Sequence, residues 1–438
     1  MADAAALKYL FPGHDATVAR RAVRIGLFGL IIHLTAPIGL SPVNAAEVTV
    51  DGRDVLVDGR PFPVRGAAGE GRMEMLKALG ATTIRTYGGD PGPVLDAADK
   101  AGLKVIAGLW LGHPRVGANY DDPVFVARQL ADIRATVERY RTHPALLMWG
   151  IGNEVEVDLS DDSKVWPAIG EAARLVRSLD SQHPTMAVLA ELGGDKVARL
   201  KAAAPDVAVL GVNSYGEALP SLPRRVREAG WDGPVVVTEM GVLGQWQAAT
   251  TPWGAPFEPS STQKAILLRR YLAPLGTEGV GAILFFWGQK QEVTTSWHSL
   301  FLPTGEWTEP LESMAENWKG HTPGDNRAPR IVSLTPAENI SAPFASWPAG
   351  STGRVRLEAG DPDGDTLDAR WIITSESTAR SVGGDTEPLP PEHPEALESG
   401  TATEATIADL PPGHYRISVE LRDGRGAAAT ANLPFEIR

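Results

Sequence analysis

Between residues 62 and 318, short apolar runs of strand length alternate with longer segments whose apolar residues recur at helical spacing. We predict strands at Phe62–Arg65, Thr82–Thr86, Lys104–Leu109, Leu146–Ile151, Thr185–Leu189, Val207–Val212, Val235–Thr238 and Ala282–Phe286. We predict helices near Arg72–Leu79, Pro93–Ala101, Pro123–Tyr140, Trp166–Leu179, Lys196–Ala203, Leu219–Glu228, Gln263–Leu272 and Glu309–Trp318. Eight strand–helix pairs over about 260 residues are typical of a closed (β/α)8 barrel.

An open, doubly wound α/β sheet would show the same alternation with fewer repeats. Such sheets often carry a Gly-x-Gly-x-x-Gly turn after the first strand, and no such turn follows Phe62–Arg65. We therefore predict an α/β fold of the TIM-barrel type. Ahead of it, Val48–Gly52 and Val55–Pro61 have the pattern of a small hairpin with Asp-Gly turns.

The pattern changes after residue 320, where helical spacing ends. Residues 321–329 contain turn formers without an apolar period, which predicts a linker between a barrel domain at 46–320 and a second domain at 330–438. The second domain alternates apolar and polar residues, as an immunoglobulin-like β-sandwich does. Within it, Thr378–Gly400 is rich in Pro, Glu and Ser and is predicted to be a long inserted loop. The linker also predicts that a chain ending near Lys319 folds alone.

The first 45 residues have the pattern of an export signal. Arg20, Arg21 and Arg24 precede an apolar stretch, and Val43–Ala45 offers a small-residue cleavage site. An uncleaved membrane anchor is the alternative, although Pro37 and Gly39 interrupt the apolar stretch. We expect a periplasmic or secreted protein without stable membrane insertion after cleavage.

Composition narrows the function. The chain has 41 basic and 54 acidic side chains and a net charge of -13, which argues against nucleic acid or an anionic membrane as its main partner. It contains no cysteine, which excludes disulfides and thiol chemistry, and no pair of histidines has metal-ligand spacing. We predict no cofactor and no metal in the barrel.

One segment combines buried-strand character with candidate chemistry. An apolar run from Leu146 ends in Gly150, Gly152, Asn153 and Glu154. Active sites of TIM barrels lie at the C-terminal ends of the strands, so this run would deliver an amide and a carboxylate to the barrel mouth. The alternative is a buried strand followed by an ordinary helix cap.

Most of the other predicted strands also end in hydrogen-bonding or aromatic side chains. These are Arg85 and Tyr87, Trp110 and His113, Glu191, Asn213 and Tyr215, Glu239, and Trp287 and Gln289. A barrel with a purely structural role would not require such groups on one face. We expect Trp110 to be among the substrate-binding residues.

The segment His143–Glu154 and the segment Gly233–Gly241 resemble strands of the large clan of retaining β-glycosidases, and most closely the family 2 catalytic barrels. The resemblance implies that Glu154 is the acid/base and Glu239 the nucleophile. It implies that Arg85 braces the nucleophile, that Tyr215 hydrogen-bonds it and that Trp287 lies under the reactive sugar. It covers roughly residues 62–318. Family 2 barrels normally follow two β-domains, whereas the pattern here predicts a small hairpin directly before the barrel, which is a departure from that family.

The chemistry agrees with this resemblance. Retaining hydrolysis needs two carboxyls about 5–5.5 Å apart, one attacking the anomeric carbon and one protonating the leaving oxygen. Side chains from the fourth and seventh strands can converge across the mouth of an eight-stranded barrel. Asn153 would bind a sugar 2-hydroxyl, a contact that strengthens in the transition state. Structural roles are the alternatives: an ion pair for Arg85, and core packing for Tyr215 and Trp287.

Several other side chains have open interpretations. Glu191 is a possible substrate contact, whereas Glu156 is expected to be solvated. His113 could bind sugar or be an ordinary loop histidine. The three tryptophans in the loops after the seventh and eighth strands could be stacking platforms or packing residues; they are Trp246, Trp253 and Trp297. Alternating aspartates at 361, 363 and 365 could bind calcium or form a plain acidic turn.

These observations predict an exported retaining β-glycosidase, or a transglycosylase that uses the same two glutamates. Its partner would be an oligo- or polysaccharide, such as a β-linked glucan or a related cell-envelope polymer. The alternative is a non-catalytic carbohydrate-binding or scaffolding protein with a degenerate barrel.

Overall fold

The structure is a computed structural model that describes residues 46–438 except 323, 340–342 and 381–383. The predicted signal peptide at 1–45 lies outside the described residues. Within the described part, none of the helices has the length and hydropathy needed to cross a bilayer.

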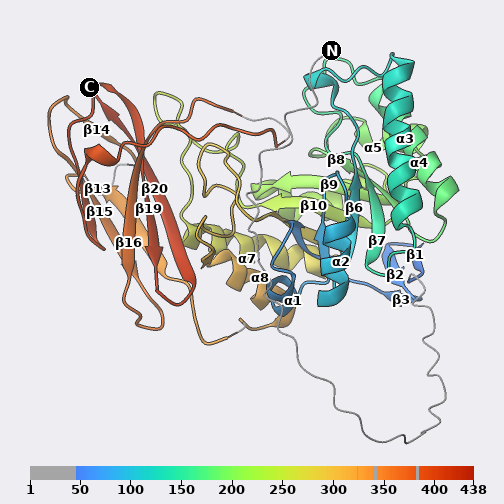
Figure 1. Cartoon of the computed structure of the whole chain (residues 1–438), viewed down its shortest axis with the longest axis horizontal. Helices are drawn as coiled ribbons and strands as arrows, with labels where there is room; N and C mark the ends of the chain where they lie inside the picture. The colour runs from blue at the N-terminus through green and yellow to red at the C-terminus, as the bar shows by residue number, and fades with distance from the viewer. Residues whose placement is uncertain (1–45, 323, 340–342, 381–383) are drawn as a thin grey trace, which may run out of the picture. The chain divides into compact units, whose positions relative to one another are not determined.

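Eight parallel strands close into a barrel, as predicted (Figure 1). They are β4 (Arg65–Gly69), β5 (Thr83–Arg85), β6 (Lys104–Leu109), β7 (Leu146–Ile151), β8 (Thr185–Leu189), β9 (Val209–Tyr215), β10 (Val235–Gly241) and β11 (Gly281–Trp287). They follow one another around the barrel in chain order, and β11 pairs with β4 to close it. This order carries all eight C-terminal strand ends to one rim.

Helices connect the strands and cover the outside of the barrel. They are α1 (Met73–Ala78), α2 (Gly92–Ala101), α3 (Pro123–Tyr140), α4 (Val165–Leu179), α5 (Lys196–Ala203), α6 (Leu222–Glu228), α7 (Ser261–Thr277) and α8 (Pro310–Lys319), with short 3-10 turns η1 (Pro114–Val116) and η2 (Gly216–Ser221). Local chemistry sets several ends. Ser260 and Gln263 form a capping box at the start of α7, and Gly102 ends α2 in the left-handed conformation (φ 68°).

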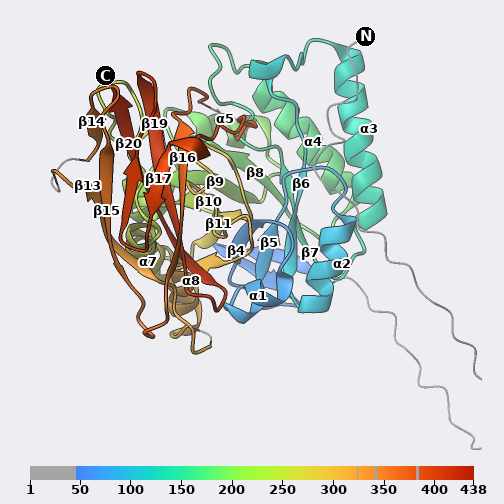
Figure 2. The same ribbon diagram turned by 60° about the vertical axis from the view of Figure 1, so that its left-hand side comes forward.

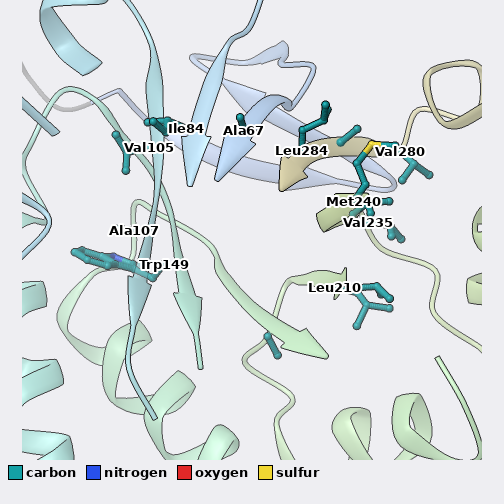
Figure 3. Close-up of a cluster of buried hydrophobic side chains, with 14 of the residues drawn as sticks. Ala67, Ile84, Val105, Ala107, Trp149, Leu210, Val235, Met240, Val280 and Leu284 are labelled. Atoms are coloured by element: carbon teal, nitrogen blue, oxygen red, sulfur yellow. The ribbon is translucent and has the colours of Figure 1, made fainter. Parts of the chain in front are cut away.

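The barrel strands are buried on both faces, which explains their continuous apolar runs. Every residue of β7 is buried. Side chains such as Ala67, Ile84, Val105 and Leu210 belong to the core between strands and helices (Figure 3). A second apolar cluster, which includes Ile106, Met148 and Ile283, comes from the other face of the same strands. The barrel is thus a packed core and not an open channel.

The first barrel strand lies further along the chain than predicted. We expected it at Phe62–Arg65, but β4 spans Arg65–Gly69. Its small residues give a weak apolar signal, and packing requires one of them. A Cβ on Gly66 would lie 1.7 Å from the carbonyl oxygen of Thr83 on β5, so only glycine fits there.

The N-terminal hairpin forms as predicted. It consists of β1 (Val48–Asp51), β2 (Asp54–Val57) and β3 (Arg60–Pro61). Asp58 (φ 50°) and Gly59 (φ 72°) both adopt the left-handed conformation that a tight Asp-Gly turn needs.

The C-terminal region contains two sheets that share one core. One sheet orders β13 (Arg330–Pro336), β15 (Gly353–Gly360), β18 (Glu404–Ile407) and β17 (Leu397–Gly400). The other contains β12 (Trp307–Thr308), β20 (Ala427–Ile437), β19 (Gly413–Arg422) and β16 (Asp368–Ser375), with β14 (Ala345–Trp347) beside β20. The Tyr415 hydroxyl donates to the Pro411 carbonyl at 3.0 Å, as the tyrosine corner of immunoglobulin-like sandwiches does.

The predicted inserted loop Thr378–Gly400 is wrong at its C-terminal end. Residues Pro394–Ala396 form a 3-10 turn, η3, and Leu397–Gly400 form β17. The sequence Leu-Glu-Ser-Gly has a weak strand pattern, and its pairing with β18 is a tertiary contact.

Strand pairing and hydrogen bonds join the barrel and the sandwich, which lie side by side (Figure 2). Strand β12, which precedes α8, pairs in parallel with β20 and so joins the sandwich sheet. The buried Arg416 of β19 donates to the Pro256 carbonyl at 3.0 Å. The Asn432 amide donates to the buried Glu258 carboxylate at 2.5 Å. The sandwich is therefore attached through backbone pairing and buried polar groups.

Candidate active site

The carboxylate of Glu239, which lies within β10, is held by side chains from two other strands. Arg85 of β5 donates from Nη1 to Glu239 Oε1 at 3.3 Å, and Tyr215 of β9 donates to Oε2 at 2.9 Å. All three side chains are buried. A guanidinium and a phenol hydroxyl thus contact the two oxygens of Glu239 from different directions and fix the carboxylate in place.

Glu154 follows β7 in an unusual backbone conformation. Its φ of 50° lies in the left-handed region, and Gly152 two residues earlier has φ 64°. A non-glycine residue in this region stores strain of roughly 1–3 kcal/mol and often marks a functional site. Asn213 donates from Nδ2 to Glu154 Oε1 at 2.9 Å.

A continuous hydrogen-bond network links the two carboxylates. Asn213 Nδ2 also lies 3.1 Å from Asn153 Oδ1, and the same oxygen accepts from Arg85 Nη2 at 2.7 Å. Arg85 reaches Glu239 in turn. The side-chain arrangement on one carboxylate is therefore coupled to that on the other.

The electrostatic environment distinguishes the two glutamates. Burial, and then the negative charge of Glu239, raise the pKa of Glu154 to about 8. Glu154 thus keeps its proton at neutral pH, whereas Glu239 has a guanidinium and a phenol at its oxygens. A protonated acid next to a braced carboxylate is an arrangement that enzymes use for acid/base and nucleophilic roles.

Both carboxylates line one pocket of about 430 Å³, a size within the range of small-molecule sites. Its other lining residues are Val157, Asp158, Ala190, Glu191, Asn213, Tyr215, Gln245, Trp246, Gln247, Phe285, Glu292 and Gly384. Among the described residues, neither lysine nor arginine lines this pocket.

Four of the predicted substrate-binding residues do not line the pocket: Arg85, Asn153, Trp287 and Trp110. Arg85 is buried behind Glu239, to which it donates. Asn153 is buried beside Asn213, which takes the lining position instead. Trp287 is 1% exposed, packs its ring on Phe301 and donates its indole N–H to Gly71, so it is a core residue here. Trp110 is half exposed in a separate hollow beside α3 and stacks on His113.

The structure distinguishes the residues with open interpretations by their burial and by whether they line the pocket. Glu156, expected to be solvated, is buried and paired with Lys196 at 3.1 Å. His113 is buried, and neither ring nitrogen has a hydrogen-bond partner among the described residues. Of the loop tryptophans, only Trp246 lines the pocket, where it is exposed and contacts the Tyr215 ring edge-on.

The other two tryptophans have packing roles. Trp297 is buried and donates to the Leu243 carbonyl, and Trp253 stacks on His414 of the sandwich with a ring separation of 5.0 Å. Sequence position alone did not separate these roles, because all three residues lie in the loops after the seventh and eighth strands.

Several pocket residues carried no assignment from the sequence. The sequence analysis names Asn213 as a strand-end residue but gives it no role. A role could have been inferred, because Asn213 lies two residues before Tyr215 and so faces the same side of β9. Glu292 pairs with Lys290 and His298; although burial opposes it, their hydrogen bonds and charges lower the pKa of Glu292 to about 2. Gly384 belongs to the sandwich, and no local pattern could connect it with the barrel mouth.

The acidic turn of the sandwich is largely occupied by its own contacts. Oxygens of Asp361, Asp363 and Asp365 lie within 4.8 Å of one another. Asp361 accepts from the backbone N–H groups of the other two, and Asp365 pairs with Arg425 at 2.9 Å. These bonds account for an acidic turn, one of the two expected alternatives.

Comparisons with known proteins agree with the resemblance found in the sequence. No family model matches the chain. A protein described as a putative β-glucuronidase of Formosa agariphila is 25% identical over 127 residues, which is 28% of this chain and 12% of that protein.

Solved structures with the same fold include a β-D-glucuronidase of Dictyoglomus thermophilum, with TM-score 0.50 and 20% identity over 62% of this chain and 53% of that one. A family 2 β-galacturonidase of Eisenbergiella tayi has TM-score 0.50 and 19% identity over 64% of this chain and 55% of that one. This chain thus spans about half the length of each solved structure. At these identities, the comparison shows a shared barrel fold.

Proposed function

We propose that this protein is a retaining β-glycosidase, or a transglycosylase, in which Glu239 is the nucleophile and Glu154 the acid/base. One observation carries the proposal: two carboxyls from β7 and β10 share a hydrogen-bond network but stand in opposite electrostatic environments. A degenerate carbohydrate-binding barrel would not need this pairing.

In the first step, a Glu239 oxygen attacks the anomeric carbon and the bond to the leaving oxygen breaks. Glu154 donates its proton to that oxygen, so the leaving group departs as an alcohol. Esterification of Glu239 removes the negative charge that helps to raise the pKa of Glu154. Glu154, now ionised, can take a proton from water or a sugar hydroxyl, which attacks the same carbon and releases Glu239.

The pocket favours a neutral sugar over a uronic acid. Five of its lining side chains are carboxyls: Glu154, Asp158, Glu191, Glu239 and Glu292. The nearby Lys290 and Arg115 are paired with Glu292 and Asp385. Within the described part of the chain, a substrate carboxylate in this pocket would meet like charges and would find neither lysine nor arginine in the lining, which is costly. We therefore extend the proposal to β-linked glucans or related neutral envelope polysaccharides, although similar solved structures are described as uronidases.

Paired substrates test this choice of sugar. The full-length protein should hydrolyse p-nitrophenyl β-glucoside at least about 100-fold better than the matching glucuronide, measured as kcat/KM. Preference for the glucuronide would overturn the neutral-sugar assignment and leave the glutamate roles intact.

The roles of the two glutamates are tested by substitution. Glu239→Gln should abolish covalent labelling by a 2-deoxy-2-fluoro glycoside, because the nucleophile is gone. Glu154→Gln should slow substrates with poor leaving groups most, and azide should rescue breakdown of its intermediate as a β-glycosyl azide. Proton NMR of the first-formed product gives the stereochemistry. An α-configured product from a β-linked substrate would exclude Glu239 as nucleophile.

A further inference from the structure

A short segment of the sandwich contacts the barrel mouth beside the catalytic pocket. It comprises residues 384–387, between β16 and β17, and we call it the docking segment. Gly384 lines the pocket together with Glu154 and Glu239. The sandwich therefore supplies part of the pocket wall.

One side of the docking segment is attached to the loop after β6. Asp385 accepts from Nη1 of Arg115 at 2.5 Å and from Nη2 at 3.0 Å. This two-point contact fixes both the position and the orientation of the carboxylate. The Arg115 side chain is 11% exposed, so the pair is partly shielded from water.

The other side is attached to the loop after β11. Lys290 donates from Nζ to the Gly384 carbonyl at 2.8 Å, and the Val293 N–H donates to Glu387 Oε2 at 2.6 Å. Glu387 is 5% exposed, so its carboxylate is fixed within the protein. The docking segment is thus bonded to two separate loops of the rim.

The position of these two loops around the barrel has a consequence for the substrate. Between β11 and β6, the shorter path around the barrel passes through β4 and β5, and the longer path passes through β7–β10. The described residues that line the pocket come from the longer path, from β11 and its loop, and from Gly384; none comes from β4, β5 or β6. The docking segment therefore lies where the pocket stops.

We propose that the docking segment is a specificity element that closes the pocket on the β4–β5 side, so that the site accepts the end of a carbohydrate chain and not its interior. Asp385 and Glu387 act as positioning residues, because they hold the wall without touching the reacting atoms. The inference rests on the proposed glycosidase function and adds how the substrate must enter.

The product pattern of the full-length protein tests the inference. Linear β-1,3- and β-1,4-linked gluco-oligosaccharides of two to six units, labelled at the reducing end, are the probes. During early hydrolysis we expect the free monosaccharide and a labelled product one unit shorter. Labelled products shortened by several units at once, without the intermediate lengths, would overturn the inference. If the probes are untouched and the fluoro glycoside does not label Glu239, the proposed function fails instead.

Substitution of Asp385 and Glu387 tests whether the docking segment forms a wall of the pocket or only stabilises the fold. Asp385→Asn combined with Glu387→Gln removes both charges and keeps the side-chain sizes. We expect KM for an aryl monoglycoside to rise about tenfold with a smaller change in kcat, and internal cleavage products to appear from the hexamer. An unchanged KM and product pattern would contradict the assignment.

A matched control lies further along the same connection. Glu395 has a side chain that is 68% exposed and pairs with His393 of the same connection at 3.3 Å, so Glu395→Gln removes one exposed charge at a distance from the docking contacts in the sequence. It should leave KM and products as in the parent protein. Asp385→Asn alone, with its melting temperature measured, keeps the test valid if the double variant fails to fold.

Discussion

At the residue scale, Glu154 illustrates how position and chemistry reinforce one another. Glu154 has a left-handed backbone (φ 50°) and lies three residues after the end of β7. Asn213 donates a hydrogen bond to one of its carboxylate oxygens. Burial and the neighbouring Glu239 then disfavour its charged form. The strained turn and the raised pKa therefore both arise from the place where the strand delivers this side chain.

The pKa of Glu154, raised from 4.5 to about 8, predicts the basic limb of the pH profile. The protonated acid is the active form, so kcat/KM for a substrate with a poor leaving group should fall tenfold per unit above about pH 8. Initial rates between pH 5 and about 10 measure this limb. In Glu154→Gln the limb should vanish, and a limb that persists there would belong to another group.

The raised pKa of Glu154 also makes the free energy of unfolding depend on pH. The folded state binds this proton more tightly than the unfolded chain, so the contribution is complete below pH 4.5 and is lost as the pH rises to about 8. Urea unfolding of the parent protein and Glu154→Gln across this range should show their stabilities diverging in that direction.

At the scale of elements, the barrel depends on how closely its strands approach. Gly66 on β4 allows the backbone of β5 to pass where a Cβ would collide with Thr83. Gly276 in α7 has nothing within 4 Å of a built Cβ and no positive φ. A side chain is therefore excluded at Gly66 but not at Gly276.

Alanine at these two positions should have opposite effects. Gly66→Ala must push β4 away from β5, so we expect it to lower the free energy of unfolding by about 1–3 kcal/mol or more. Gly276→Ala should raise it by about 0.5–1 kcal/mol, because alanine favours the helix. Denaturant melts of both variants against the parent give the two signs. Equal effects would show that strand spacing does not depend on Gly66.

At the scale of the whole molecule, contacts at the junction between barrel and sandwich argue against the expectation that the barrel folds alone. Strand β12 lies before the linker but pairs with β20. Further bonds cross the junction, including those of Arg416 with Pro256 and Asn432 with Glu258. The docking segment adds contacts at the pocket itself.

A chain that ends at Lys319 should therefore be less stable than the full chain and should bind substrate poorly. It loses the partner of β12 and leaves buried polar groups such as Glu258 with fewer bonds, at a cost of about 1–3 kcal/mol for each group left unsatisfied. Thermal melting and aryl glycoside kinetics of both chains test this. A truncated chain with parental melting temperature and KM would show that the sandwich is a separate module.

The sequence by itself determined the elements and the candidate chemistry of the barrel. Strands such as Lys104–Leu109 and Leu146–Ile151, and helix Pro123–Tyr140, lie at their predicted bounds, because a strand buried on both faces has a continuous apolar run and an outer helix a periodic one. Parallel closure then brought the strand-end residues Glu154 and Glu239 to one pocket.

Only the tertiary structure decided which side chains face that pocket. Trp287 and Trp246 are both aromatic residues near strand ends, but one packs in the core and the other lines the site, and that difference depends on loop paths. Gly384 is 145 residues from Glu239 (384 − 239) and reaches the pocket through the sandwich. The local pattern of apolar residues indicates which face of a helix or strand is buried. Contacts between segments far apart in the sequence depend instead on how the whole chain packs.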